Sequence, residues 1–484
     1  MEYIENKELE EKEVKGIFTD MIKYAPSKLC GMFGNMITVP IYTSLFSQEQ
    51  YGLYTISIAM LSFLCIIFSD WVGLSGLRFF RHHQIENDLP KYMSTLVTLL
   101  SINMLLMFSL SFIFRIPLYN FFHVPFKYFL AVLLLIIPVA IRALLSQILR
   151  AQLKSISYTI TTILNQFATI LMTVVFAKCF HFGAASILLG MGVSITLIDM
   201  LLLYQCDILK MLKLQKVEWK FLFPIIQYGV PVAATSLSAW IITQSNKFIM
   251  NSIDGFSQAA LVGAGYGLTM PILMPLFAMI TVAAIPRIYN LFEAKVDVRP
   301  VVTRFMGYYI LVAIPVITVM SMYNVEMAHI FIKNPKMYEA SVLVPYFSYG
   351  VFFLALTDYT TMQYHLANKT HIEFIIKLLS GIIGVVLNYI LILKMGLIGA
   401  GIATFAANFL YCLLSIIIVV PKLNIYFPKN MIIRILLSGL PCSGAYYLLK
   451  FYGTAIPGAI QMVLLLACFY LTYYVIRRKV ITQE

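Results

Sequence analysis

The chain has 484 residues, of which 60% are hydrophobic and only 12% are charged. An ordinary soluble domain is about a quarter charged residues, so this composition cannot cover a water-soluble surface. A chain of this length would otherwise form about three soluble domains, yet polar linkers long enough to separate them are missing. The composition excludes a soluble catalytic protein and indicates a chain whose solvent is the hydrocarbon of a bilayer.

The N-terminal segment, residues 1–24, is rich in Glu and Lys and lacks a small-residue cleavage site before the first apolar run. We therefore expect a cytoplasmic segment and no cleaved signal peptide. The seven cysteines are scattered, without a Cys-x-x-Cys pair and without His at the spacing of zinc ligands. They are interpreted as small packing residues, and no metal site is expected.

About fourteen apolar runs follow one another along the chain. A spanning helix needs about 20 such residues, because the hydrocarbon core is about 30 Å thick and an α-helix rises 1.5 Å per residue. The sequence predicts spanning helices at roughly Ala25–Phe46, Gly52–Leu74, Tyr92–Phe114, Phe126–Leu149, Ile156–Ala177, Ala184–Tyr204, Phe221–Met250, Leu261–Ile285, Phe305–Tyr323, Leu343–Tyr364, Ile372–Leu393, Leu397–Val420, Met431–Phe451 and Ile456–Ile476.

Positive charges fix the predicted orientation, because Lys and Arg of short loops stay on the cytoplasmic side. With the N-terminus inside, all but eight of the 35 Lys and Arg lie in cytoplasmic segments or helix ends; the exceptions are Arg115, Lys127, Lys178, Lys247, Lys333, Lys336, Lys394 and Lys450. Both termini, including the tail at 477–484, are predicted inside. The net charge of +13 then faces anionic headgroups, and no nucleic-acid partner is expected.

A long-range repeat orders the first twelve helices. One set of residues in the first half, Ala151, Lys154, Lys178 and Gly183-Ala184, has a counterpart in the second half, Ala367, Lys369, Lys394 and Gly399-Ala400. The first alanine and the Gly-Ala pair are 32 residues apart in both copies. Six helices per copy is an even number, so both copies enter the membrane from the same side. The alternative is chance similarity between apolar segments.

The predicted fold is all-α and polytopic, with two parallel six-helix lobes around a central cavity. The lobes are residues 25–205 and 221–420, joined by a basic amphipathic connection at 206–220 on the inner surface. An extra helix pair at 431–476 stands outside the repeat. Two such lobes that rock against each other form a transporter architecture.

Three segments resemble the multidrug/oligosaccharidyl-lipid/polysaccharide (MOP) exporter superfamily, and within it the Wzx-type polysaccharide flippases. They are Val39-Pro40-Ile41-Tyr42 followed by Gln50-Tyr51-Gly52-Leu53-Tyr54, Ser245-Asn246-Lys247 followed by Val262-Gly263-Ala264-Gly265-Tyr266, and Gly396-Leu397-Ile398-Gly399-Ala400-Gly401-Ile402-Ala403-Thr404. The helix count is similar to that of the longer members. Asn246 departs from the family's usual acidic residue, which questions ion coupling at that position.

The resemblance implies a flippase of the bacterial cytoplasmic membrane that moves an undecaprenyl-pyrophosphate-linked oligosaccharide to the outer leaflet for O-antigen, capsule or exopolysaccharide synthesis. It implies the lipid bilayer and this glycan as partners, with a polysaccharide polymerase and chain-length machinery as further ones. A drug or metabolite antiporter of the same superfamily is the alternative. A membrane glycosyltransferase or polymerase is less favoured, because the outer connections are short and no catalytic residues are identified.

Intramembrane charges are the candidate site residues, because a charge at mid-bilayer costs several kcal/mol. Lys28, Arg142 and Lys247 could bind pyrophosphate and sugar, although snorkelling of the long side chains to the headgroups is the alternative. Lys247 lies roughly 35 Å along a straight helix from Pro224, which predicts a place near the outer surface.

Three acidic residues, Asp70, Asp199 and Asp358, could bind H+ or Na+ and so couple transport to an ion gradient. The alternative is a buried ion pair, such as Asp70 with Arg142. No Gly-x-x-x-x-Gly-Lys-[Ser/Thr] motif is present, so no nucleotide or other cofactor is expected.

Two further groups have simpler interpretations. Glu373 and Lys377 have the spacing of a local ion pair on one helix. His82 and His83 are interpreted as solvated headgroup contacts in a cytoplasmic loop.

Overall fold

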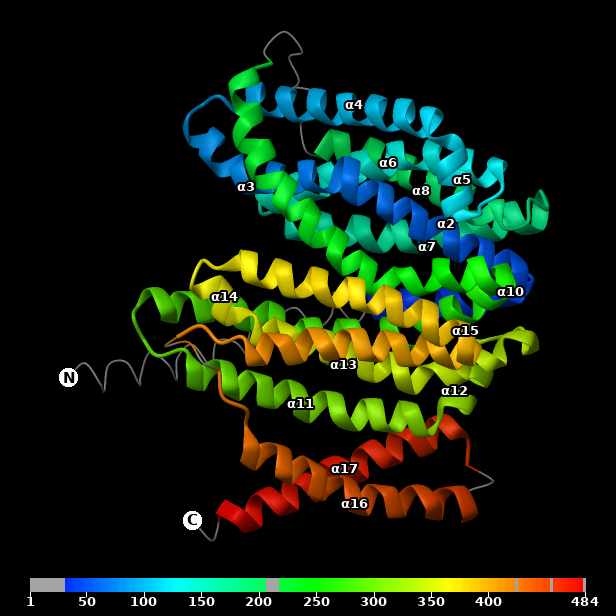
Figure 1. Cartoon of the computed structure of the whole chain (residues 1–484), viewed down its shortest axis with the longest axis vertical. Helices are drawn as coiled ribbons and strands as arrows, with labels where there is room; N and C mark the ends of the chain where they lie inside the picture. The colour runs from blue at the N-terminus through cyan, green and yellow to red at the C-terminus, as the bar shows by residue number, and fades with distance from the viewer. Residues whose placement is uncertain (1–30, 206–216, 422, 424, 453–455, 482–484) are drawn as a thin grey trace. The chain divides into compact units, whose positions relative to one another are not determined.

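The computed structural model describes residues 31–205, 217–421, 423, 425–452 and 456–481. This part of the chain is helical (Figure 1), and eleven of its helices are long and apolar enough to cross a membrane. The prediction of an all-α polytopic membrane protein is therefore confirmed. The chain divides into two compact units: an N-terminal unit, Ile41–Gly263, and a C-terminal unit, Ala264–Glu484 together with residues 31–40.

The N-terminal unit consists of long helices and the first part of α10. Its elements are α2 Gln48–Cys65, a π-helical segment Ile66–Asp70, α3 Trp71–Ile85, α4 Leu89–Ile113, α5 Arg115–Phe122, α6 Phe126–Ala151, α7 Ser155–Cys179, α8 Ala185–Gln205, a 3-10 turn Trp219–Phe221, and α10 from Leu222. Within this unit α8 packs against both α6 and α7, and α6 packs against α3 (Figure 1).

Local sequence explains where several of these helices begin and turn. Ser47 Oγ accepts a hydrogen bond from the backbone N–H of Gln50, and the backbone N–H of Ser47 donates one to Gln50 Oε1, so a capping box starts α2. The segment from α2 to α3 is one span, Gln48–Ile85. It contains the π-helical segment that ends at Asp70, and such segments are common at functional sites.

Aromatic residues make up much of the N-terminal core. Phe63, Phe122, Trp240 and Phe248 pack within one buried cluster, with Trp240 and Phe248 each 7% exposed. The Trp240 indole nitrogen donates a hydrogen bond to Ser62 Oγ at 2.9 Å. The first part of α10 is thereby fixed to α2 in the same unit.

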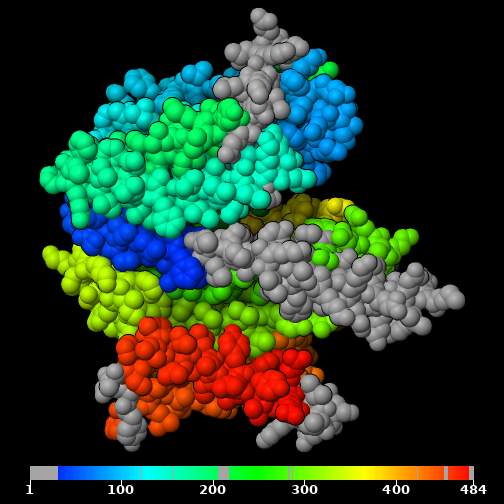
Figure 2. All heavy atoms as spheres, turned by 180° about the vertical axis from the view of Figure 1, so that it is seen from behind, coloured from blue at the N-terminus to red at the C-terminus, as the bar shows by residue number. Residues whose placement is uncertain are grey.

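The C-terminal unit contains the remaining helices. They are the rest of α10, which ends at Glu293, then α11 Arg299–Met322, α12 Asn324–Phe331, a 3-10 segment Pro335–Val342, α13 Leu343–Thr360, α14 Met362–Leu366, α15 Thr370–Ile417, α16 Lys429–Tyr452 and α17 Gly458–Ile481. Helix α13 packs against α15 and α11, while α16 and α17 pack on each other and on α11. Figure 2 shows this last pair in orange to red as one block.

Two long helices are each broken at a glycine. The backbone leaves the helical region at Gly255 (φ 79°) in α10 and at Gly396 (φ 56°) in α15. A positive φ costs little only for glycine, which accounts for this residue type at both breaks. The breaks lie in the two places where the sequence predicts a connection between successive spans.

The boundary between the compact units lies at Gly263, within α10, whereas the predicted lobes meet at residues 206–220. Most of that connection lies outside the described residues. Its end contacts the N-terminal unit: Lys91 Nζ donates to Glu218 Oε1 at 2.7 Å, and the Glu218 backbone donates to Thr95 Oγ1 at 3.1 Å.

Candidate functional site

Arg142 and Asp199 form an ion pair inside the N-terminal unit. Arg142 Nη1 of α6 lies 3.7 Å from Asp199 Oδ1 of α8, and the two side chains are only 12% and 7% exposed. Arg142 Nη2 donates a second contact, a 2.9 Å hydrogen bond to the carbonyl of Thr161 in α7. The sequence suggests Asp70 as a partner for Arg142, whereas the partner in the structure is Asp199.

This ion pair is loose. Arg–carboxylate hydrogen bonds usually close to about 2.7–2.9 Å, whereas Arg142 Nη1 lies 3.7 Å from the carboxylate and the short hydrogen bond of this guanidinium goes to the Thr161 carbonyl. Among the described residues, neither carboxylate oxygen of Asp199 nor Nη1 of Arg142 has a hydrogen-bond partner. The site therefore offers two acceptors and one charged donor that can still bind polar groups.

Asp70 lies apart from this pair, at the end of the π-helical segment. Its Oδ1 accepts a hydrogen bond from Ser69 Oγ at 3.2 Å, and the residue is half-buried. The neighbouring Trp71 indole donates to the carbonyl of Ile67, which fixes the backbone around the carboxylate.

Lys247 lies on α10 in the N-terminal unit and is half-buried. Its neighbours Asn246 and Phe248 are buried, at 0% and 7% exposure, and Phe248 packs against Trp240 and Phe122. Lys247 precedes the break at Gly255 by about two helical turns. The third predicted cation, Lys28, lies outside the described residues.

Glu373 is the centre of a polar cluster in the C-terminal unit. Its carboxylate contacts His365 Nε2 at 2.8 Å and Lys377 Nζ at 3.0 Å, and it accepts a 3.2 Å hydrogen bond from the Tyr411 hydroxyl. The Lys377 ammonium also lies 5.3 Å from the centre of the Tyr411 ring. The predicted Glu373–Lys377 pair is confirmed, and it is part of a larger cluster that ties α14 to both ends of α15.

Asp358 lies on α13 close to the same cluster. Its side chain is exposed and interacts electrostatically with Lys377, Glu373 and His365. The cluster thus contains two carboxylates but one permanently charged cation. Asp358 is the acidic residue of this cluster that the structure leaves accessible.

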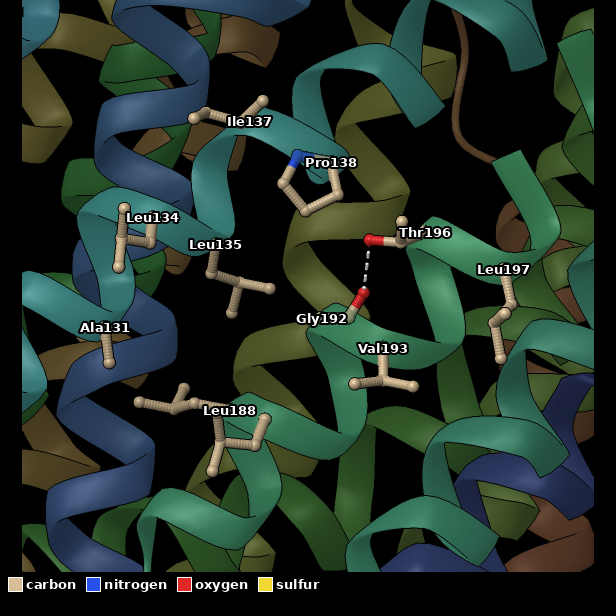
Figure 3. A pocket seen from close by; sticks show the side chains of 11 residues that line it. Ala131, Leu134, Leu135, Ile137, Pro138, Leu188, Gly192, Val193, Thr196 and Leu197 are labelled. Atoms are coloured by element: carbon tan, nitrogen blue, oxygen red, sulfur yellow. Dashed lines mark hydrogen bonds between the residues drawn. The ribbon is translucent and has the colours of Figure 1, made fainter. Parts of the chain in front are cut away.

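An apolar groove runs between α6 and α8 (Figure 3). Its volume is about 540 Å³, and eleven residues line it: Ala131, Leu134, Leu135, Ile137, Pro138, Leu188, Leu189, Gly192, Val193, Thr196 and Leu197. The hydroxyl of Thr196 is bonded to the carbonyl of Gly192 at 2.8 Å, so even this side chain offers the groove an apolar surface. The groove suits a hydrocarbon chain.

His83 differs from its sequence-based interpretation. It is only 7% exposed, its ring stacks on Tyr92 with centroids 4.2 Å apart, and Nδ1 lies 2.8 Å from Asp88 Oδ1. The interpretation as a solvated headgroup contact is therefore wrong for His83, because these neighbours cover the ring. His82 remains exposed, beside Glu86. His83, Glu86 and Asp88 could also hold a metal ion, but the contact of His83 with Asp88 already explains how the α3–α4 turn is fixed.

The sequence by itself predicts neither the groove nor the contacts of Glu373 with His365 and Tyr411. The groove depends on how α6 and α8 face each other, and no sequence signal gave that register. The partner of a single polar residue in an apolar helix cannot be predicted from the local sequence. The partner of Tyr411, for example, lies 38 residues away along the chain.

One protein family matches this chain. The chain matches the family described as "Polysaccharide biosynthesis protein" over residues 20–292, which is more than half of its length. No curated protein matches it.

Two kinds of solved structure share the fold. The chain is similar to a structure of the lipid II flippase MurJ in an inward closed conformation, with a TM-score of 0.77 and 15% identity over 96% of this chain and 100% of that one. It is also similar to an inward-facing multidrug resistance MATE transporter of the MOP superfamily, with a TM-score of 0.57 and 13% identity over 81% and 92%. The chain belongs to the polysaccharide biosynthesis protein family, and it shares the fold of the MurJ flippase and of the MATE transporter.

Proposed function

We propose that this protein is a flippase that moves a polyprenyl-pyrophosphate-linked oligosaccharide from the inner to the outer leaflet of a bacterial cytoplasmic membrane. Both termini face the cytoplasm, and transport proceeds by alternating access. The translocated unit supplies the synthesis of a surface polysaccharide. A polysaccharide polymerase and its chain-length machinery would take up the product outside.

The extent of the fold match carries this proposal. The similar lipid II flippase is covered completely and covers 96% of this chain, whereas the MATE transporter covers 81%. Helices α16 and α17, Lys429–Tyr452 and Gly458–Ile481, lie in the last tenth or so of the chain. Because the lipid II flippase matches 96% of this chain, the match must include much of the α16–α17 pair. The similarity to this lipid transporter is therefore more extensive than the similarity to the MATE drug transporter, which covers 81% of the chain. The polysaccharide biosynthesis family supports a glycan as cargo.

The proposed architecture has fourteen crossings in two parallel six-helix lobes and an extra pair. Two observations support it. Helices α10 and α15 span 72 and 48 residues, enough for two crossings each. Residues with a left-handed backbone conformation follow corresponding helices in the two halves. Asn87 in the first half corresponds to Lys295 in the second, and Leu153 corresponds to Asn368.

We assign the candidate charges as follows. Arg142 and Lys247 bind the phosphate groups of the substrate, together with Lys28. Asp358, beside the Glu373 cluster, and Asp70 are the groups through which H+ or Na+ couples to transport. Asp199 is less suited to that task, because Arg142 already balances its charge.

A depletion experiment tests the function. Cells that lose the protein should accumulate the lipid-linked oligosaccharide where only enzymes of the inner leaflet can modify it, and they should lose the surface polysaccharide. Re-expression of the wild-type chain should restore both, whereas Arg142→Ala should not. Normal surface polysaccharide together with increased sensitivity to organic cations would reject the flippase in favour of a drug antiporter.

A further inference from the structure

The residues that line the apolar groove and the Arg142–Asp199 pair follow one another along the same two helices, α6 and α8. On α6 the groove-lining residues continue at helical spacing to Arg142, one turn beyond Pro138. On α8 they continue to Asp199, one turn beyond Thr196. The pair therefore lies at one end of the groove, and it is the end nearer the predicted cytoplasmic ends of both helices.

The Arg142–Asp199 pair places a positive and a negative group side by side at the polar end of this surface. A bare cation that approached the Asp199 carboxylate would meet the guanidinium of Arg142, and a bare anion at Arg142 would meet the carboxylate. Both oxygens of Asp199 and Nη1 of Arg142 are buried without a hydrogen bond among the described residues. A ligand that carries an anionic oxygen and a hydroxyl donor side by side matches this arrangement.

The apolar end is shaped by residues with little side-chain bulk. Pro138 interrupts the hydrogen-bond ladder of α6, and Gly192 leaves an open place on α8. A Cβ atom at Gly192 would already lie 3.4 Å from Leu135 Cδ1, so a larger side chain there would fill the floor of the groove (Figure 3). The groove is lined almost entirely by apolar side chains and suits an acyl or isoprenoid chain.

We propose that this surface is a binding site for a lipid-linked phosphosugar. The isoprenoid chain lies in the α6–α8 groove, a phosphate oxygen accepts a hydrogen bond from Arg142 Nη1, and a sugar hydroxyl donates to Asp199. This inference rests on the proposed flippase function and names where the substrate is held within the N-terminal unit. Asp199 is then a substrate acceptor instead of a coupling residue.

The direction of the groove agrees with a lipid of the inner leaflet. Asp199 lies six residues before the end of α8 and Arg142 nine before the end of α6, which is roughly 9–14 Å from the predicted cytoplasmic helix ends. From the pair the groove runs toward the opposite side of the membrane. A lipid whose headgroup is drawn to this depth points its chain in that direction.

Native mass spectrometry of the full chain in detergent tests the proposal with three probes. They are undecaprenyl pyrophosphate carrying one N-acetylhexosamine, undecaprenyl pyrophosphate without sugar, and phosphatidylglycerol. The wild-type chain should bind the sugar-bearing lipid most tightly. Gly192→Leu should weaken binding of both undecaprenyl lipids by about tenfold or more, since it fills the space for the chain. Gly439→Leu is the matched control, because nothing lies within 4 Å of a Cβ there.

Two further variants test the polar end. Asp199→Asn should reduce the preference for the sugar-bearing over the sugar-free lipid and leave binding of the sugar-free lipid intact. Arg142→Met together with Asp199→Leu removes both charges, which is tolerated better than removal of one. It should abolish the preference for the sugar-bearing lipid and weaken both pyrophosphate lipids by about tenfold or more, as expected for a lost bond to a charged group.

Either of two results would overturn the site. One is wild-type binding of all three probes by Gly192→Leu and by the double variant. The other is equal binding of the three probes to the wild-type chain, which would indicate a general site for anionic lipids. If the binding results fail while depletion of the protein still traps the glycolipid in the inner leaflet, the flippase function stands and only this site is rejected.

Discussion

Gly52 of α2 approaches the backbone of Phe256 in α10 so closely that a Cβ atom at position 52 would lie 1.8 Å from the Phe256 carbonyl oxygen. Both residues belong to the N-terminal unit. Because the neighbouring atom is backbone, it cannot turn aside as a flexible side chain can. Only glycine allows the two helices to meet at this distance.

We predict that Gly52→Ala destabilises the N-terminal unit by about 1–3 kcal/mol, the usual cost of overpacking. Heating the purified chain in detergent, followed by size-exclusion chromatography of what remains monodisperse, measures the change in melting temperature. Gly439→Ala provides the control, because its Cβ meets no atom within 4 Å. Equal melting of Gly52→Ala and the wild-type chain would show that the contact is looser than described.

The Lys91–Glu218 pair makes a pH-dependent contribution to stability. The hydrogen bond from Lys91, with the nearby Lys220, lowers the pKa of the Glu218 carboxyl below its ordinary value. A depressed carboxyl pKa stabilises the folded state above the ordinary pKa of about 4.3, and this contribution is lost as the pH falls through the lower, folded-state value.

Melting temperatures of the wild-type chain and Glu218→Gln should therefore differ at pH 7 and converge as the pH falls below about 4. The pair is partly exposed, so the difference at pH 7 should be small and should shrink at high salt. Glu293→Gln, at the end of α10, serves as a control at another helix end. A difference that grows on acidification would contradict this account.

Removing only Glu373 from its cluster should destabilise the protein more than removing both Glu373 and Lys377. Glu373→Leu leaves Lys377, whose side chain is 14% exposed, without its carboxylate, and we expect a loss of about 3–5 kcal/mol. Adding Lys377→Met should recover much of that loss, since no buried charge then remains. The melting temperatures of the two variants in the same detergent test this prediction. A double variant that melts below Glu373→Leu would contradict the explanation by an unpaired Lys377.

Asp358 is the acidic residue of that cluster that remains accessible, and we predict a role in coupling. In proteoliposomes, Asp358→Asn should flip the lipid-linked oligosaccharide at one rate whether or not a pH or Na+ gradient is imposed, whereas the wild-type rate should depend on one of the two. Asp254→Asn, at an exposed position on α10, is the matched control. Retention of the wild-type gradient dependence by Asp358→Asn would exclude this residue.

Sequence alone determined that the chain is a helical membrane protein and where most spans lie. Hydropathy is a local property, because about 20 consecutive apolar residues suffice to predict a span. The Glu373–Lys377 pair was also predictable, since residues four apart share one face of a helix. Even the breaks of α10 and α15 fall where the sequence places connections, at glycines that tolerate a positive φ.

Tertiary structure decided which charges meet. Arg142 has two acidic candidates in its own half, and their sequence separations do not distinguish them; the packing of α6 against α8 selects Asp199. The burial of His83 depends on Tyr92 and Phe221, which lie on other elements. The α6–α8 groove exists only because two helices face each other in one register. Hydrophobicity requires only that these helices be buried in lipid, whereas the complementarity of their surfaces fixes which faces meet.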